Sequence, residues 1–135
     1  MTRVLVVEDN AVNSKLIQRM LEKLGCTVTL AEDGMDALSV ARREEFDLVL
    51  MDWQRPGIDG LETTRRLREF WRDDRQIPVV AVTASAMQGD RARCMQAGMS
   101  DYLTKPVRMN ALAEVVNRWA GTTASKRPVR TGSLL

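Results

Sequence analysis

The chain of 135 residues contains no histidine, and this absence limits the chemistry that it can perform alone. No imidazole is available as a general base or a metal ligand, so any histidine chemistry must come from a partner. The two cysteines, Cys26 and Cys94, form no metal-binding or redox spacing. They are typical of reduced thiols in a cytoplasmic protein.

Long apolar runs are also missing. No segment approaches the roughly 20 apolar residues that span a bilayer, and the first strand begins too early to leave room for a signal peptide.

The net charge of +2 is too small to indicate binding to nucleic acid or to a membrane. Arginines of the 61–72 region alternate with acidic residues, which favours a solvated helix face over a nucleic-acid surface. These arginines are Arg65, Arg66, Arg68 and Arg72.

Short apolar runs alternate with segments of helical periodicity along the chain. The runs predict strands at 4–7, 27–31, 48–51, 79–82 and 102–103, and the periodic segments predict helices at 12–24, 34–45, 61–70, 87–97 and 112–119. Five βα units of this kind predict an α/β fold with a parallel sheet and helices on both faces. We expect one folded domain over 1–120 and a flexible linker or tail over 121–135.

The helical spacing also predicts which apolar side chains face the core. On the first helix the apolar positions include Val12, Leu16, Ile17 and Leu21, and on the second Met35 and Leu38 are expected to face inward.

Chemically active side chains stand where the predicted strands end. The first strand leads into Glu8 and Asp9, the third ends at Asp52, the fourth at Thr83, and the fifth runs into Lys105. The carboxyl ends of parallel strands meet at one edge of a sheet, where ligands of such folds bind. We therefore expect three acids, a hydroxyl and an ammonium to converge there.

Three neighbouring carboxylates repel one another, and a divalent cation removes this conflict. Oxygen ligands without histidine or cysteine favour Mg²⁺, or Mn²⁺ in its place, over zinc. Singly, each residue has an ordinary structural explanation: an Asp after a strand is usually a helix cap, Thr83 suits an N-cap, and Lys105 suits a solvated surface. Their joint placement favours phosphoryl transfer to a carboxylate nucleophile.

Four motifs in this order resemble the receiver domain of two-component response regulators over residues 3–120. The motifs are VEDNAVN, LVLMD followed by PGIDG, AVTASAM, and AGMSDYLTKP. The resemblance implies a flavodoxin-like doubly wound (βα)5 fold with a five-stranded parallel sheet in the order 2-1-3-4-5. Asn10, Asn13 and the segment 81–106 are most similar to receivers of hybrid sensor histidine kinases, although a stand-alone receiver also fits.

The resemblance assigns Asp52 as the phosphoacceptor, which takes a phosphoryl group from a phosphohistidine of a histidine kinase or histidine phosphotransfer domain. Glu8, Asp9, Asp52 and the backbone carbonyl of Gln54 would hold the metal. Thr83 and Lys105 would bind the phosphoryl oxygens. The reaction would be Mg²⁺-dependent self-phosphorylation and slow autodephosphorylation, without turnover of an independent substrate.

The resemblance also implies a conformational switch. Thr83 would move toward the phosphate as Tyr102, the switch aromatic, turns inward, and Pro106 would follow a cis peptide bond. The family usually carries methionine where this chain has Arg55, whose role in screening the pocket or contacting a partner is a hypothesis. We expect a monomer or weak dimer that contacts neither nucleic acid nor membrane directly.

Two other functions are compatible with parts of the pattern. A receiver-like binding module could regulate a kinase without accepting phosphate, but the five active-site residues favour phosphorylation. A phosphohydrolase with an aspartyl-phosphate intermediate needs a second acid two residues after the nucleophile, and Gln54 occupies that position.

Overall fold

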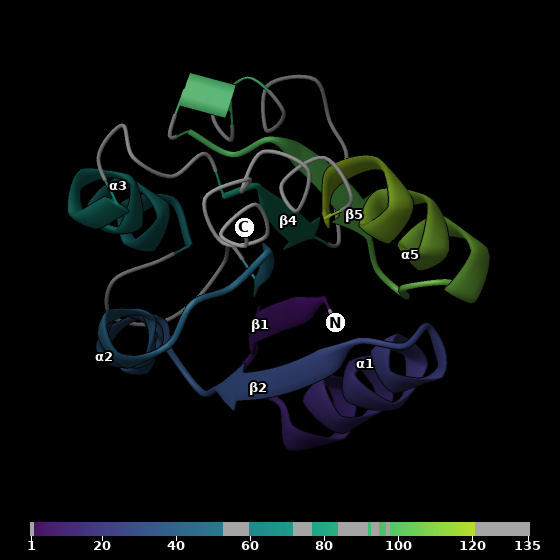
Figure 1. Cartoon of the computed structure of the whole chain (residues 1–135). Coiled ribbons are helices and arrows are strands. Elements are labelled where there is room, and N and C mark those ends of the chain that lie inside the picture. Colours follow the sequence, from purple (N-terminus) through teal and green to yellow (C-terminus); the bar gives the residue numbers. More distant parts are fainter. Residues whose placement is uncertain are drawn as a thin grey trace, which may run out of the picture.

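The computed structural model describes residues 2–52, 60–71, 77–83, 92, 95, 96 and 98–120. They form a parallel sheet between two layers of helices (Figure 1). The strands are β1 (Arg3–Val7), β2 (Thr27–Ala31), β3 (Leu48–Asp52), β4 (Val79–Thr83) and β5 (Asp101–Thr104). The helices are α1 (Ala11–Lys23), α2 (Gly34–Arg43), α3 (Gly60–Trp71) and α5 (Met109–Val115), which continues into the π-helix η1 (Val116–Ala120).

The sheet has five strands in the order β2-β1-β3-β4-β5, and every pairing is parallel. This confirms the predicted doubly wound fold and strand order. Of the predicted helix over 87–97, the described residues are 92, 95 and 96, all helical. Gln54, Arg55 and the expected tail over 121–135 lie outside the described residues.

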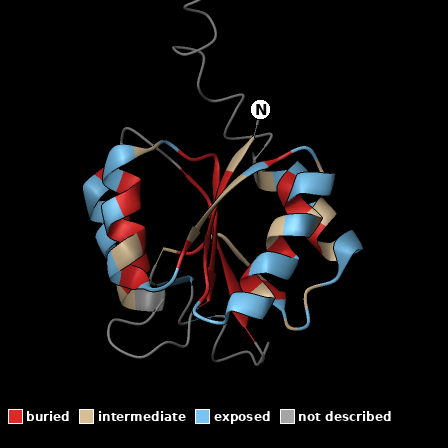
Figure 2. Ribbon diagram, turned by 90° about the horizontal axis from the view of Figure 1, so that it is seen from below, coloured by how far each residue is buried: buried red, intermediate tan, exposed pale blue. Residues whose placement is uncertain are grey.

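The strand sequences build two cores because successive side chains point to opposite faces of the sheet. Leu5 and Val7 of β1 face the layer formed by α2 and α3, whereas Val4 and Val6 face the layer formed by α1 and α5. Figure 2 shows this arrangement as buried strands between helices that are buried on their inner sides and exposed outside. The apolar runs are therefore continuous because both sheet faces are covered.

Helix α1 begins at a side-chain cap directly after the acidic pair of the first strand end. The Asn10 Oδ1 atom accepts hydrogen bonds from the backbone N–H groups of Val12 and Asn13, both at 3.0 Å. Such a cap satisfies N–H groups that lack partners within the helix. It also orients the helix so that its N-terminus lies beside Glu8 and Asp9.

On α2 the prediction that apolar residues face inward is correct for Leu38 and wrong for Met35, and the apolar positions of α1 divide in the same way. Ile17 and Leu21 are buried, but Val12 is 76% exposed, Leu16 is 54% exposed and Met35 is 60% exposed. Helical spacing identifies the apolar side of a helix, but the sheet covers only part of that side. Residues at its edge and near the helix start therefore remain in contact with solvent.

The prediction of a solvated arginine face on α3 is correct for two residues and wrong for a third. Arg65 and Arg66 are exposed and pair with Glu62. Arg68 is partly buried instead: its Nη2 atom donates to the Gly98 carbonyl at 2.8 Å, and its Nη1 atom donates to the Ile77 carbonyl. Burial lowers the pKa of the Arg68 guanidinium. Arg68 thereby joins α3 to the segments that precede β4 and β5.

Candidate functional site

The register of the central strands determines which side chains meet at the carboxyl edge of the sheet. Val7 of β1 pairs with Met51 of β3, so the next residues, Glu8 and Asp52, leave the sheet at the same level. Asp52 in turn pairs with Val82 of β4, which immediately precedes Thr83. Thr83 pairs with Thr104, and the backbone N–H of Lys105 donates to the Thr83 carbonyl at 2.8 Å.

Glu8, Asp9 and Asp52 form a compact carboxylate cluster. One carboxylate oxygen from each lies within 4.8 Å of the others. Glu8 and Asp52 are both 5% exposed, whereas Asp9 is exposed. Burying two carboxylates side by side is unfavourable unless cations or hydrogen bonds compensate for the lost hydration.

Lys105 supplies part of this compensation. Its Nζ atom lies 3.4 Å from Asp52 Oδ2 and 3.7 Å from Glu8 Oε1. The backbone N–H of Asn10 donates to Glu8 Oε2 at 3.2 Å. When ionised, the three carboxylates and one ammonium leave two net negative charges, which matches the charge of one divalent cation.

The pKa of the Glu8 carboxyl is raised, as expected for a buried carboxyl beside a second acid. Burial raises this pKa above its ordinary value of 4.5 and is the largest influence on it. The hydrogen bond from Asn10 lowers the pKa, the neighbouring Asp52 raises it, and the charge of Lys105 lowers it. The described residues thus leave the buried carboxylate incompletely compensated.

This donor set fits a hard divalent cation. All three side chains present oxygen atoms, and two are buried at one end of a rigid sheet. Mg²⁺ prefers such carboxylate oxygens and retains several water molecules as further ligands. The cluster could therefore bind a metal ion.

The remaining predicted residues lie around this cluster or on the strand next to it. Thr83 is buried at the end of β4, the Lys105–Pro106 peptide bond is cis, and Tyr102 on β5 packs against the core that faces α2 and α3. The backbone carbonyl of Gln54 lies outside the described residues. The structure thus brings Glu8, Asp52 and Lys105 into direct proximity.

A cavity of about 200 Å³ beside the carboxylate cluster was not predicted from the sequence. Asn13 and Leu16 of α1 line it on one side, and Lys105, Pro106 and Val107 line it on another. The spacing of Asn13 and Leu16 indicates a shared helix face. Only the tertiary structure, which places this face of α1 and the segment after β5 around one cavity, shows that the face opens next to Lys105.

The fold is that of a flavodoxin-like domain, and three carboxylates cluster at the carboxyl edge of its sheet. A family model described as the response regulator receiver domain matches residues 4–117. The chain therefore belongs to the family of response regulator receiver domains and is a receiver domain of two-component signalling. Within the described residues, no helix is long and apolar enough to cross a membrane.

Curated relatives agree with the resemblance to hybrid kinases: the chain is 40% identical over 123 residues to hybrid signal transduction histidine kinase G of Dictyostelium discoideum, a match that covers 90% of this chain and 4% of that kinase. The chain is 46% identical over 121 residues to the sensor protein GacS of Pseudomonas syringae, a match that covers 88% of this chain and 13% of GacS. The chain thus spans a small part of the length of this curated relative.

Two solved structures extend the comparison. The receiver domain of sensor histidine kinase PA1611 from Pseudomonas aeruginosa is 45% identical, with a TM-score of 0.80 over 89% of this chain and 98% of that one. That structure has a magnesium ion coordinated in its active-site cleft. The receiver domain of Saccharomyces cerevisiae Ssk1, crystallised with the histidine phosphotransfer protein Ypd1, is 31% identical, with a TM-score of 0.83 over 88% of each chain.

Proposed function

We propose that Asp52 is the phosphoacceptor of this receiver domain. The observation that carries the proposal is the cluster of Glu8, Asp9 and Asp52 within 4.8 Å, with the Lys105 ammonium 3.4 Å from Asp52. The Asp52 carboxylate attacks the phosphorus of a phosphohistidine. The bond from phosphorus to the Asp52 oxygen forms as the phosphorus–nitrogen bond breaks, and the donor imidazole keeps the electron pair.

The other residues of the site assist this transfer. Glu8, Asp9, Asp52 and the backbone carbonyl of Gln54 would hold Mg²⁺, or Mn²⁺ in its place. A bound cation would neutralise the charge that develops on the phosphoryl oxygens. Lys105 and Thr83 bind those oxygens by an ionic contact and a hydroxyl hydrogen bond.

The proposed phosphodonor is a histidine kinase or a histidine phosphotransfer domain. The chain itself contains no histidine, and its similarity to the Ssk1 receiver crystallised with Ypd1 supports a donor of this kind. Exposed Val12 and Leu16 on α1 lie next to the cavity beside Lys105, where an apolar helix surface of the donor can pack. We propose this α1 surface as the docking face.

The signal is a change of conformation near β5. A phosphoryl group adds negative charge and acceptor oxygens at Asp52, and it draws the Thr83 hydroxyl toward them. The half-buried Tyr102 then turns further into the core. This proposal extends to a folded domain over 1–120 with a flexible tail over 121–135, in a cytoplasmic protein that is a monomer or weak dimer.

The alternative is a receiver-like module that binds a kinase without accepting phosphate. Incubation with Mg²⁺ and a small acyl phosphate separates the two, with intact mass as the readout. We expect one phosphoryl group per chain, none after Asp52→Asn, and none when a chelator removes the metal. Asp36→Asn, at the start of α2, is the matched control and is expected to be phosphorylated normally.

The outcomes decide between three functions. A folded chain that acquires no phosphoryl group is a binding module, and a chain that turns over the donor rapidly and repeatedly is a phosphohydrolase. A second arm uses a phosphorylated histidine phosphotransfer domain as the donor. Leu16→Asp is expected to slow this transfer while leaving phosphorylation by the small donor unchanged, because only the protein donor contacts α1.

A further inference from the structure

A groove between α2 and α3 lies apart from the phosphorylation site. Figure 1 shows the two helices side by side on one face of the sheet, and residues of both line two cavities between them. One cavity has a volume of about 330 Å³ and lies beside Trp71, and the other has about 460 Å³ and lies beside Met35 and Leu38. Arg42 and Phe70 line both, so the cavities are parts of one groove, here called the α2–α3 groove.

The groove shares no residue with the proposed phosphotransfer machinery. Arg43 is the last residue of α2 and Trp71 the last of α3, and both line the first cavity. The carboxylate cluster lies at the carboxyl ends of the strands, where the helices begin. The groove can therefore bind a ligand without blocking Asp52.

Large apolar side chains at the groove are in contact with solvent. Met35 is 60% exposed and Phe70 is 48% exposed, while the neighbouring Leu38 and Trp71 are buried. Two of the six exposed large hydrophobic residues in the described part of the chain thus belong to this groove. Clustered apolar surface in a hollow is more typical of a binding surface than of solvated helix faces.

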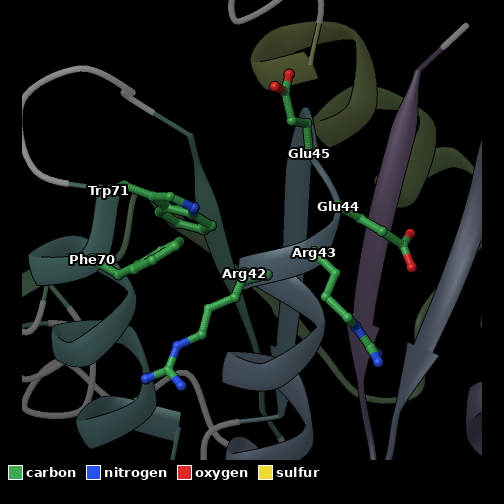
Figure 3. Close-up of a pocket in the computed structure, with 7 residues that line it drawn as sticks. Arg42, Arg43, Glu44, Glu45, Phe70 and Trp71 are labelled. Atoms are coloured by element: carbon green, nitrogen blue, oxygen red, sulfur yellow. The ribbon is translucent and has the colours of Figure 1, made fainter.

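Arg42 places a positive charge between the two cavities, and the carboxylates that also line them, from Glu44, Glu45 and Glu69, form no ion pair with it within the described residues. Other arginines have carboxylate partners: Arg66 pairs with Glu62, and Arg3 pairs with Glu44. Within the described residues, no such pair includes Arg42. In Figure 3, Arg42 extends from α2 toward α3, and the rings of Phe70 and Trp71 point from α3 toward α2. The charge and the rings thus border the same hollow.

We propose that the α2–α3 groove binds an amphipathic helix of a partner protein that presents one carboxylate between two apolar side chains. The carboxylate pairs with Arg42, and the apolar side chains occupy the two cavities on either side of it. A helix meets this demand with an apolar residue at i, an acid at i+4 and an apolar residue at i+7, since these positions share one face. A helix packed into the groove of a helix pair is a common mode of peptide recognition.

Two other candidate occupants of the groove, the segment 121–135 and a second copy of the chain, do not offer Arg42 a suitably placed carboxylate side chain. The segment 121–135 carries Lys126, Arg127 and Arg130 and no acidic side chain, so none of its side chains can neutralise Arg42. On a second copy of the chain, the exposed apolar pair of α1 is Val12 and Leu16, and the acidic residue of that helix, Glu22, does not lie between them. A separate protein with an acidic amphipathic helix is the occupant that complements the groove.

The test uses a synthetic helical peptide of about 15 residues, near the shortest length that holds a helix in water. It carries Leu, Glu and Leu at positions i, i+4 and i+7 in an alanine-rich background, and its matched control carries Gln in place of Glu. Binding to the full chain is followed by NMR titration. We expect the shifted amide signals to lie on α2 and α3 and the Glu peptide to bind more tightly.

Three variants locate the binding surface. Arg42→Gln is expected to weaken binding of the Glu peptide about threefold, as for an exposed ion pair, and to leave the Gln peptide unaffected. Phe70→Ala is expected to weaken both peptides about fivefold or more, because it removes the apolar wall. Arg19→Gln, on the exposed side of α1, is the matched control and is expected to change neither affinity.

The outcomes are unambiguous. Absence of binding at millimolar peptide, signals that move only outside α2 and α3, or equal effects of Arg42→Gln on both peptides would each overturn the proposal. Phosphorylation by a small acyl phosphate is measured on the same variants and is expected to be unchanged. Loss of groove binding and failure of phosphorylation at Asp52 are therefore detected separately.

Discussion

Replacing Lys105 by methionine tests whether one ammonium compensates the buried carboxylates. The variant keeps an unbranched side chain of similar length and removes the positive charge. With an effective dielectric constant of about 20, Coulomb's law gives an attraction of about 5 kcal/mol at the 3.4 Å separation from Asp52 and about 4.5 kcal/mol at the 3.7 Å separation from Glu8. The carboxylate oxygens lie within 4.8 Å of one another, so the repulsion between two ionised carboxylates is at least about 3.5 kcal/mol on the same scale.

Screening by solvent reduces these interaction energies. The Lys105 side chain is 30% exposed, and Asp9 is exposed as well. Because hydration of the ammonium in the unfolded chain offsets part of the attraction, we expect Lys105→Met to lower the free energy of unfolding by about 2 kcal/mol in the absence of divalent metal. With saturating Mg²⁺ the difference between the two proteins is expected to shrink, because a bound cation takes over the compensation.

The stability that the Lys105→Met variant loses also depends on pH. Burial raises the pKa of Glu8 in the folded protein above 4.5, so the folded state retains a proton that the unfolded chain has released. Stability therefore falls as the pH rises above 4.5. Lys105 lowers this pKa, so its removal raises the pKa further, extends the fall to higher pH and enlarges the total loss of stability. The part of the loss that comes from Glu8 is expected to vanish below pH 4.5, where the carboxyl is protonated in both states.

Urea unfolding followed by circular dichroism provides the measurement, with chelator and with Mg²⁺, at neutral pH and below pH 4.5. Lys15→Met, at an exposed position of α1, is the matched control and is expected to change stability little. If the Lys105 variant is as stable as the wild type at neutral pH without metal, the electrostatic account of the site is wrong.

Three further predictions concern the scaffold. Asn10→Ala is expected to cost about 1 kcal/mol in urea unfolding, because it removes both side-chain cap hydrogen bonds of α1. Burial raises the pKa of the Cys26 thiol, so stability should fall as the pH rises above 9.0, and Cys26→Ala should abolish that slope. Gly25 and Gly98 both have positive φ, but a Cβ at Gly98 would meet Arg68 Cγ at 3.2 Å, whereas a Cβ at Gly25 would have no described atom within 4 Å beyond its chain neighbours. Alanine should therefore lower the thermal midpoint more at Gly98; equal shifts at the two positions would contradict the contact argument.

Much of the fold was accessible from local pattern. The apolar runs at 4–7, 48–51 and 79–82 became buried strands because a residue that is apolar at every position must be covered on both faces. The acidic residues at the strand ends were also identifiable, because parallel strands bring their carboxyl ends to one edge. The carboxylate cluster of Glu8, Asp9 and Asp52 is a direct consequence of this topology.

Other features depend on contacts between elements that are far apart in the sequence. Arg68 has the same local pattern as its neighbours Arg65 and Arg66, yet it donates to Ile77 and Gly98 because α3 packs against the segments before β4 and β5. Helical spacing likewise assigned Met35 to the core, although the sheet leaves it exposed beside α3. The α2–α3 groove arises in the same way, from the separation of two helices that no local pattern describes.

By itself, the sequence determined which residues are candidates for the chemistry and in what order the strands and helices follow one another. Those properties are encoded by side-chain type and by periodicity over a few neighbouring residues. Only the tertiary structure decided the distance from Lys105 to Asp52, the burial of Glu8 that raises its pKa, and the exposure of Phe70 beside an unpaired Arg42 in the described part of the chain. Distance, burial and pairing depend on how segments pack, and packing is a property of the whole molecule.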